Sequence, residues 1–216
     1  MTYQAAIFDL DGTLLNTLPD LHASVNATLS LYGFPERSED EIRRAVGDGV
    51  GMLIARSIPE GANDPRYEDC LSAFREHYAK HAADRTAPYA GILSLLAALK
   101  AKGIRIGVVS NKFDAAVKAL CRTYFGDLVE LAVGEREGIR RKPCPDSLLA
   151  VIDNFSLTPK QCIYIGDSEQ DILTARAAGL DCLSVTWGFR SRKALLTAGA
   201  TQLIDSPADI LSLLCK

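Results

Sequence analysis

Short apolar runs alternate with longer amphipathic segments along most of the chain. Runs rich in aliphatic and β-branched residues, bounded by turn residues, are typical of buried strands. They lie at Ala5–Phe8, Ile104–Val109, Leu131–Val133, Cys162–Ile165, Cys182–Val185 and Gln202–Ile204. From Gly91 onward, helical periodicity fills the gaps near residues 92–102, 114–124, 145–155, 168–178, 191–197 and 207–214.

This alternation of strands and helices indicates a parallel sheet with helices on both faces. The residues at helix ends agree, since Asp114 is placed to cap the start of one helix and Gly126 follows its end. Ser168 and Gly179 bracket another helix in the same way. We therefore predict an α/β fold with a doubly wound, Rossmann-like parallel sheet.

A long insert separates the first strand from the second. The gap is about ninety residues, whereas a crossover between parallel strands needs only about a dozen. From Leu18 to about Ala83 the periodicity is helical throughout, and Ser38 and Glu41 have the spacing of a capping box. We predict a core domain of residues 1–15 and 86–216 and an inserted α-helical domain of residues 16–85.

Composition and charge are those of an ordinary water-soluble protein. Apolar residues make up 48% of the 216 residues, charged residues 24%, and the formal net charge is -3. So small a charge creates no field that would gather nucleic acid. The sequence has no apolar stretch long enough to span a bilayer and no signal peptide. We expect a cytoplasmic protein with neither a nucleic acid nor a membrane as partner, and nothing in the sequence indicates an oligomeric state.

The six cysteines are widely scattered, at positions 70, 121, 144, 162, 182 and 215. They form no Cys-x-x-Cys pair and no zinc-ligand spacing. With the signal peptide missing, free thiols in a reducing compartment are favoured over the disulfides of a secreted protein.

Two carboxylates follow the first predicted strand, in the run Asp9-Leu10-Asp11-Gly12-Thr13. The carboxyl ends of parallel strands open onto the crevice where ligands bind. Asp9 and Asp11 lie two residues apart on extended chain and therefore point to the same side, and Gly12 permits a sharp turn that presents N–H groups. An ordinary turn is the alternative interpretation.

A second acidic pair, Asp167 and Asp171, follows the strand at Cys162–Ile165. The two residues are four apart at a helix start and share a face, although capping alone would also favour acids there. Four carboxylates at one sheet edge would repel one another unless a divalent cation lay among them. Carboxylates select a hard cation, so we predict Mg²⁺.

Two further polar groups are expected at this edge. Lys142 supplies a fixed cation in the run Lys142-Pro143-Cys144-Pro145, and Ser110 and Asn111 follow the strand at Ile104–Val109. The ammonium group of Lys142 is suited to neutralise a nucleophile or a phosphoryl oxygen, and the Ser110 hydroxyl to donate to another oxygen.

Together these segments resemble the haloacid dehalogenase-like phosphohydrolase superfamily over nearly the whole chain. The phosphoglycolate phosphatase branch is most similar, in the runs Asp9-Leu10-Asp11-Gly12-Thr13, Gly47-Asp48-Gly49, Ser110-Asn111-Lys112, Lys142-Pro143-Cys144-Pro145, Gly166-Asp167-Ser168-Glu169-Gln170-Asp171 and Thr186-Trp187-Gly188-Phe189. Asn16 departs from the pattern, because the family often has another acid at this position.

The resemblance implies a role for each motif residue. Asp9 would be the nucleophile and Asp11 the general acid and base, with Ser110 and Lys142 binding phosphate. The full set of predicted substrate-binding residues is Gly12, Thr13, Ser110, Asn111 and Lys142. The predicted metal ligands are Asp9, Asp11 through its backbone carbonyl, Asp167 and, in an assisting role, Asp171. The inserted helical domain would be a cap that closes over the site.

These roles describe a Mg²⁺-dependent phosphatase acting on a small phosphorylated metabolite similar to phosphoglycolate. Mg²⁺ and Lys142 would offset the repulsion between a phosphate dianion and Asp9, which would form an aspartyl phosphate. Asp11 would protonate the leaving alkoxide and then activate water. A phosphosugar mutase resembling β-phosphoglucomutase and a pyrophosphatase remain alternatives on the same core. A dehalogenase is disfavoured because chemistry at carbon needs no acid at position 11, and an inactive binding module because the motif residues are intact.

Two further signals are interpreted as structural. The loop from Gly47 to Gly51 superficially resembles a dinucleotide loop, but it follows an amphipathic helix, so we predict a turn between two helices. His77 and His81 share a helix face without a third ligand, which favours a solvated surface.

Overall fold

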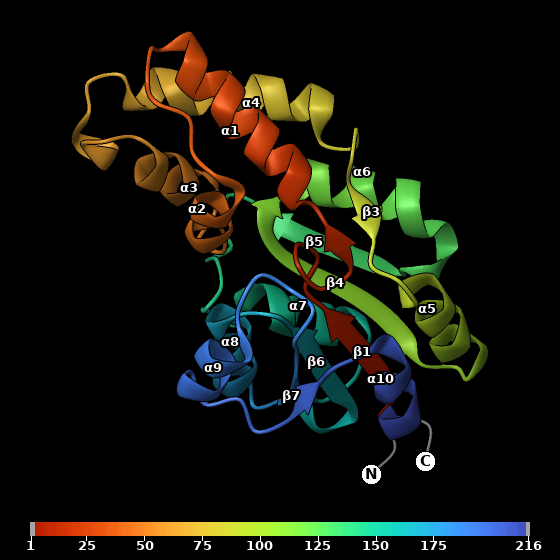
Figure 1. Ribbon diagram of the computed structural model, residues 1–216. Helices are drawn as coiled ribbons and strands as arrows, with labels where there is room; N and C mark the ends of the chain where they lie inside the picture. The colour runs from red at the N-terminus through yellow and green to blue at the C-terminus, as the bar shows by residue number, and fades with distance from the viewer. Residues whose placement is uncertain (1–2, 215–216) are drawn as a thin grey trace. The chain divides into compact units, whose positions relative to one another are not determined.

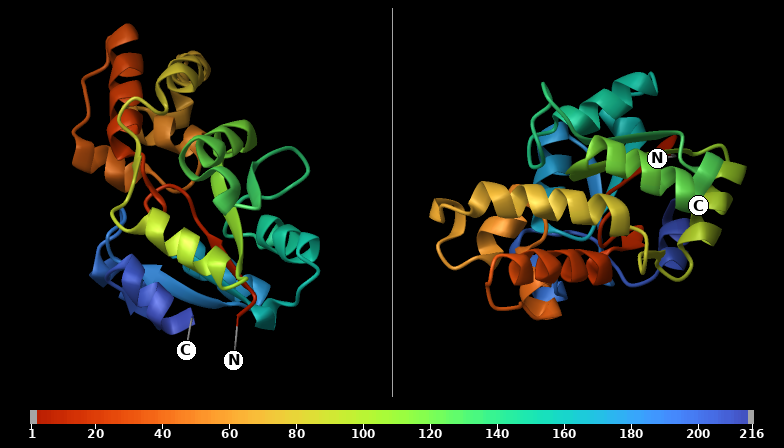
Figure 2. Two further views of the ribbon diagram at one scale, coloured as in Figure 1. Left: turned by 90° about the vertical axis from the view of Figure 1, so that its right-hand side faces the viewer. Right: turned by 90° about the horizontal axis from the view of Figure 1, so that it is seen from above.

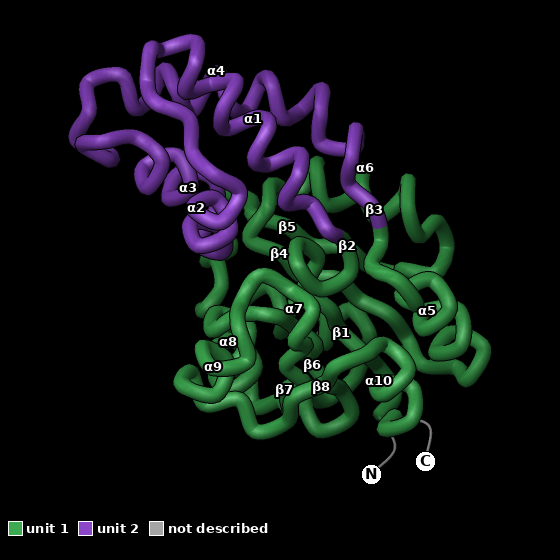
Figure 3. The backbone as a smooth tube through the Cα atoms, viewed as in Figure 1, with its two compact units in different colours: residues 1–15, 88–216 green, residues 16–87 purple. Residues whose placement is uncertain are grey.

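The computed structural model describes residues 3–214 and divides into two compact units. Unit 1 comprises Met1–Leu15 and Pro88–Lys216, and unit 2 comprises Asn16–Ala87; Figure 3 shows them in green and purple. The domain boundaries proposed from the sequence follow residues 15 and 85, and the boundaries between the compact units follow residues 15 and 87.

Unit 1 contains a parallel six-stranded sheet with the strand order β5-β4-β1-β6-β7-β8. Its strands are β1 (Ala5–Phe8), β4 (Arg105–Phe113), β5 (Leu131–Glu135), β6 (Cys162–Gly166), β7 (Asp181–Val185) and β8 (Leu203–Ile204). The predicted doubly wound parallel sheet is confirmed. The largest difference is in β4, which continues past its predicted end because its pairing with β5 resumes at Phe113 after an irregularity.

Helices cover both faces of this sheet (Figure 1; Figure 2). They are α5 (Ile92–Ala101), α6 (Asp114–Phe125), α7 (Asp146–Asn154), α8 (Glu169–Ala178), α9 (Arg192–Thr197) and α10 (Pro207–Leu214). Successive side chains of a strand point to opposite faces. In β1, Ala6 and Phe8 accordingly pack into one core with α5, α6 and α10, and Ala5 and Ile7 into a second core with α7 and α8.

The strand order reverses at β1. After β1 the chain builds β4 and β5 on one side, and it then builds β6, β7 and β8 on the other. At such a switch point neighbouring connections lead away in opposite directions and leave a crevice at the carboxyl ends of the strands. The loops after β1, β4 and β6 therefore lie where a ligand is expected.

Three of the four helix-end predictions in unit 1 are confirmed. Ser168 precedes α8 with its N–H donating to Asp171 Oδ2 at 3.0 Å, Gly179 ends α8 in the left-handed region, and Gly126 follows α6. The prediction for Asp114 is wrong, because Phe113 occupies the capping position. β4 leads directly into α6, and the Asp114 carboxylate instead accepts the Gly134 N–H at 3.0 Å.

Unit 2 is helical between its two connections, as predicted. It contains α1 (Leu18–Leu31), α2 (Glu39–Ala45), α3 (Val50–Ser57), the short 3₁₀ helix η1 (Gly61–Asn63) and α4 (Tyr67–His81). The capping box of α2 is present, with the Ser38 N–H donating to Glu41 Oε2 at 2.8 Å. At the ends of the unit, β2 (Leu15–Asn16) and β3 (Ala87–Pro88) form a separate two-stranded sheet.

A buried carboxylate ties the two ends of unit 2 together. Asp20 in α1 is 1% exposed and accepts the N–H groups of Arg85 at 3.0 Å and Thr86 at 2.8 Å. Because the Asp20→Ala substitution leaves those donors unpaired, we expect it to lower the free energy of unfolding by about 1.5–3 kcal/mol in urea titrations. Asp84→Ala, which removes an exposed carboxylate paired with His81, should change it by less than about 0.5 kcal/mol. Equal effects of the two substitutions would contradict this interpretation.

The five cysteines in the described part of the chain are all free thiols, as predicted, and Cys215 lies outside the described residues. Within residues 3–214, no helix combines the length and the apolar character needed to cross a membrane.

Candidate active site

A closed turn holds Asp9 and Asp11 at the carboxyl end of β1. The Asp9 N–H donates to the Ile165 carbonyl of β6 at 2.8 Å, and the Leu10 carbonyl accepts the N–H groups of Leu14 and Leu15 at 3.0 and 2.9 Å. Gly12 has a positive φ of 84° within this turn. The turn therefore fixes the backbone of both predicted catalytic carboxylates.

Lys142 lies beside two of the acids that were predicted to meet at this sheet edge. Its ammonium nitrogen is 2.8 Å from Asp9 Oδ1 and 2.7 Å from Asp171 Oδ1. Asn111 fixes the lysine backbone, because its amide oxygen accepts the Lys142 N–H at 2.8 Å and its amide nitrogen donates to the Lys142 carbonyl at 3.1 Å. Asn111 thus contacts the lysine backbone through both ends of its side-chain amide.

The Asp171 carboxylate is engaged on both oxygens. Oδ1 faces Lys142 and accepts the Tyr164 hydroxyl at 2.9 Å, and Oδ2 accepts the Ser168 N–H. Sequence reasoning missed Tyr164, which reads as a core residue of β6. Its position in the middle of the strand gives no signal that its hydroxyl reaches a carboxylate.

Asp167 occupies a cradle made by backbone from two other loops. The Phe189 N–H donates to Asp167 Oδ2 at 2.6 Å, and the Thr13 hydroxyl is 3.4 Å from Oδ1. A Cβ atom on Gly12 would stand 2.4 Å from Oδ2, and one on Gly188 would stand 2.3 Å from the Asp167 Cβ. Both positions therefore need glycine, because any side chain would displace the carboxylate.

The donor set of these acids fits a hard divalent cation. Asp9, Asp167 and Asp171 each offer a carboxylate oxygen, and these three oxygens lie within 4.8 Å of one another. The ammonium group of Lys142 faces two of the three carboxylates, those of Asp9 and Asp171. The remaining negative charge matches a divalent ion with oxygen ligands, such as Mg²⁺. The Asp11 side chain lies outside this group, which leaves its backbone carbonyl as the predicted ligand.

Burial and mutual repulsion raise the pKa values of Asp9 and Asp167. Burial is the largest cause for Asp9, whose pKa lies well above its ordinary value, and the charges of Asp171 and Asp167 add to it while Lys142 opposes it. For Asp167, burial and then Asp171 raise the pKa to about 7. Burial lowers the pKa of Lys142, but Asp171 and Asp9 outweigh this and raise it overall. A bound cation would remove much of the penalty on the carboxylates.

Known proteins are similar to this chain over most of its length. The model of the haloacid dehalogenase-like hydrolase family matches residues 6–185. The chain belongs to this family. A phosphoglycolate phosphatase of Rhodospirillum rubrum is 35% identical over 96% of this chain and 89% of its own length. An N-acetylmuramic acid 6-phosphate phosphatase of Pseudomonas aeruginosa is 31% identical over 99% of this chain and 96% of its own. A crystal structure from Lactobacillus delbrueckii subsp. bulgaricus has a TM-score of 0.94 at 35% identity and covers 99% of both chains.

Asp11 of this hydrolase is paired with a second lysine, Lys112, for which no role was predicted. The Lys112 ammonium nitrogen is 2.8 Å from Asp11 Oδ1, and the Ser110 hydroxyl is 3.4 Å from Asp11 Oδ2. Lys112 belongs to the run Ser110-Asn111-Lys112, which resembles the phosphoglycolate phosphatase branch, and it lies two residues after Ser110 along β4. If the predicted strand had extended to Lys112, the alternation of side chains would have placed Ser110 and Lys112 on the same face.

Trp187 and Phe189 also contact the site, through the loop after β7. The Trp187 indole N–H donates to the Thr13 carbonyl at 3.0 Å, and the Phe189 N–H holds Asp167. Their run was recognised by resemblance alone. Neither contact could be predicted from the type of side chain, because each one uses a backbone group, the Thr13 carbonyl or the Phe189 N–H.

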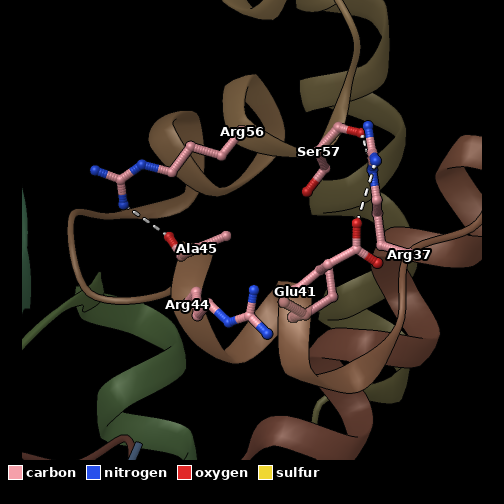
Figure 4. Close-up of a pocket in the computed structure, with 7 residues that line it drawn as sticks. Arg37, Glu41, Arg44, Ala45, Arg56 and Ser57 are labelled. Atoms are coloured by element: carbon pink, nitrogen blue, oxygen red, sulfur yellow. Dashed lines mark hydrogen bonds and ion pairs between the residues drawn. The ribbon is translucent and has the colours of Figure 1, made fainter. Parts of the chain in front are cut away.

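Unit 2 of this hydrolase has a surface pocket of about 240 Å³ between α2 and α3 (Figure 4). Arg37 donates to the Ser57 carbonyl at 2.8 Å, and Arg56 donates to the Ala45 carbonyl at 2.9 Å. None of the seven lining residues is a predicted site residue. The neighbouring run Gly47-Asp48-Gly49 lies between the same helices, as predicted.

The two histidines of α4 only partly fit the predicted solvated surface. Their rings are 4.4 Å apart, so they share a face, and His81 is exposed. His77 is half-buried, however, with its Nδ1 3.0 Å from the Ser24 hydroxyl of α1. The packing of α1 against α4 explains the difference.

Proposed function

We propose that this hydrolase is a Mg²⁺-dependent phosphatase that cleaves small phosphomonoesters through an aspartyl phosphate on Asp9. One observation carries the proposal. The Asp9 carboxylate lies 2.8 Å from the Lys142 ammonium nitrogen, and one carboxylate oxygen from each of Asp9, Asp167 and Asp171 lies within 4.8 Å of the other two. An anionic nucleophile can approach a phosphate dianion only where cationic charge offsets their repulsion. Lys142 supplies part of that charge.

The side chains are suited to a reaction in two steps, each a displacement at phosphorus. An Asp9 oxygen attacks phosphorus while the bond to the leaving oxygen breaks, and Asp11 gives its proton to that oxygen. A water molecule then attacks phosphorus while Asp11 takes up a proton from the water. The bond between phosphorus and the Asp9 oxygen breaks, so phosphate is released and the Asp9 carboxylate is restored. When bound among the acids, Mg²⁺ would neutralise phosphoryl charge and orient the oxygens.

The remaining predicted site residues are proposed to hold the phosphate. Backbone N–H groups of the turn at Gly12 and Thr13, the Ser110 hydroxyl and Lys142 are suited to phosphoryl oxygens. Asn111 was predicted to bind substrate. Its contacts with the Lys142 backbone favour a supporting role, in which it aims the ammonium group.

Phosphoglycolate is the substrate that we propose first, and the cytoplasm is the proposed location. The phosphoglycolate phosphatase of Rhodospirillum rubrum is 35% identical, but a phosphatase of a much larger sugar phosphate is 31% identical. Identity over the whole chain therefore discriminates little between substrates. We propose that unit 2 is the cap and makes this choice.

A substrate panel tests the proposed function. Purified protein would receive phosphoglycolate, N-acetylmuramic acid 6-phosphate, glucose 1-phosphate and pyrophosphate, each with Mg²⁺ or with EDTA. We expect Mg²⁺-dependent release of inorganic phosphate, fastest with phosphoglycolate. Glucose 6-phosphate formed from glucose 1-phosphate would instead indicate a mutase, and release that EDTA leaves unchanged would contradict the metal-dependent mechanism.

The raised pKa values predict that stabilisation by Mg²⁺ depends on pH. Asp167 has a pKa of about 7 in the folded protein against an ordinary 3.8, so the metal-free fold binds more protons than the unfolded chain and loses stability as pH rises between these values. Near pH 8, Mg²⁺ at about 100 times its Kd should raise Tm by about 5–10 °C. At about pH 5.5 protons compete for the ligands, and the increase should be less than about half as large. Asp167→Asn should abolish it at both pH values, whereas an equal increase in wild-type protein at both would exclude these carboxylates as ligands.

A further inference from the structure

We infer that Lys112 is a positioning residue for Asp11, and this inference rests on the proposed function. The Lys112 ammonium nitrogen lies 2.8 Å from Asp11 Oδ1 and donates a hydrogen bond to it. This bond forms both when Asp11 is ionised and when its other oxygen, Oδ2, carries the proton for the leaving group. Lys142 stands at the same distance from Asp9. Each of the two carboxylates with a proposed chemical role therefore has its own lysine.

Burial makes the pair at Asp11 a strong restraint. The side chains of Lys112 and Asp11 are 6% and 14% exposed. A buried ammonium without a nearby carboxylate would cost several kcal/mol, so a conformation that moves the Asp11 carboxylate away is disfavoured. The backbone turn fixes the Cα of Asp11, and the ion pair then selects where its carboxylate points.

The backbone that carries Lys112 is itself fixed. Lys112 belongs to β4, and its N–H donates to the Ser110 hydroxyl at 3.2 Å, while that hydroxyl lies 3.4 Å from Asp11 Oδ2. At β5, a Cβ on Gly134 would stand 2.5 Å from the Lys112 carbonyl oxygen, so the two strands approach closely at this point. Ser110 and Lys112 thus hold both oxygens of Asp11 from one strand.

A positioning role through a general acid has a specific kinetic signature. An alkyl phosphate needs a proton on its leaving oxygen as the ester bond breaks, whereas 4-nitrophenyl phosphate has a leaving group stable enough to depart without one. Displacing the acid should therefore slow the first reaction and spare the second. A purely structural defect would slow both reactions equally.

The test compares kcat/KM for phosphoglycolate and 4-nitrophenyl phosphate, because this constant reports the steps up to cleavage of the ester. General acid catalysis contributes about 10²–10⁴-fold, so Lys112→Met should lose at least about 10²-fold on phosphoglycolate and less than about threefold on the aryl ester. Asp11→Asn should show the same split, and the double variant should be no worse than Asp11→Asn alone. Lys112→Arg should recover part of the loss.

Controls separate this inference from the proposed function. Lys160→Met removes an exposed lysine from unit 1 and should leave both constants unchanged. If Lys112→Met cleaves the aryl ester, the variant is folded. If Lys112→Met does not fold, Lys112→Gln is used in its place. Equal loss on both esters, or additive losses in the double variant, would overturn the role of Lys112 while leaving the phosphatase intact. Wild-type protein that cleaves neither ester with Mg²⁺ would overturn the proposed function and this inference with it.

Discussion

Asp9→Asn is expected to abolish turnover, with a loss of at least about 10⁴-fold in kcat. The amide has nearly the shape of the carboxylate but is too weak a nucleophile to attack phosphorus. The measurement is phosphate release with Mg²⁺, together with acid quenching of a reaction with ³²P-labelled substrate. Wild-type protein should retain protein-bound label, and the variant none.

Two observations keep this result from being mistaken for unfolding. The pKa of Asp9 is raised by burial and by Asp171 and Asp167, so its charged form is disfavoured in the metal-free fold. Its neutral replacement should therefore have a Tm no lower than that of wild type at about pH 8 without metal. Asp146→Asn changes a surface carboxylate that pairs with Arg140 and should retain the wild-type rate. Wild-type turnover or retained label in Asp9→Asn would assign the nucleophile elsewhere.

Lys142→Met is expected to remove both activity and much of the stability at neutral pH. The substitution leaves three buried carboxylates without the ammonium that faces Asp9 and Asp171. Removing one partner of a buried ion pair costs about 3–5 kcal/mol. Urea titrations of metal-free protein would measure the free energy of unfolding, and phosphate release the loss of turnover.

The stability loss should depend on pH in a defined direction. The pKa of Asp167 is already raised to about 7 with Lys142 present, and that of Asp9 is raised as well, so without the lysine these two acids should be protonated and neutral near pH 5. The destabilisation should therefore grow as pH rises from about 5 to about 8. Arg140→Met removes an exposed cation from the same loop and should cost less than about 0.5 kcal/mol. A pH-independent loss in Lys142→Met would show that packing, and not charge, explains the effect.

Much of the site could be predicted because its side chains follow predicted strands. Asp9 comes directly after β1 and Asp167 directly after β6, and Ser110 follows Val109, the last residue of its predicted strand. Parallel strands bring such positions to one edge of the sheet. The partners of these residues were harder to predict. Tyr164 contacts Asp171 from inside a strand, and Asn111 contacts the backbone of Lys142. Neither contact follows from residue type, because either residue fits an ordinary core or turn.

The predicted ends of secondary-structure elements were wrong where a strand and a helix meet without a linker. Phe113 ends β4 and directly precedes α6, so Asp114 became the first helical residue, and its carboxylate accepts the Gly134 N–H instead of capping the helix. The polar run from Ser110 to Lys112 reads as a loop by composition. Pairing with β5 at Val109 and again at Phe113 keeps this run within β4.

The sequence by itself determined the α/β alternation, the helical insert and the motif residues, because hydrophobic periodicity and local turn chemistry are written along the chain. The tertiary structure decided which charges pair. Lys112 with Asp11 spans 101 positions and Lys142 with Asp171 spans 29, and only the strand order brings these groups within 3 Å. Ion pairing depends on distance in space and on burial, and neither can be read from the order of residues alone.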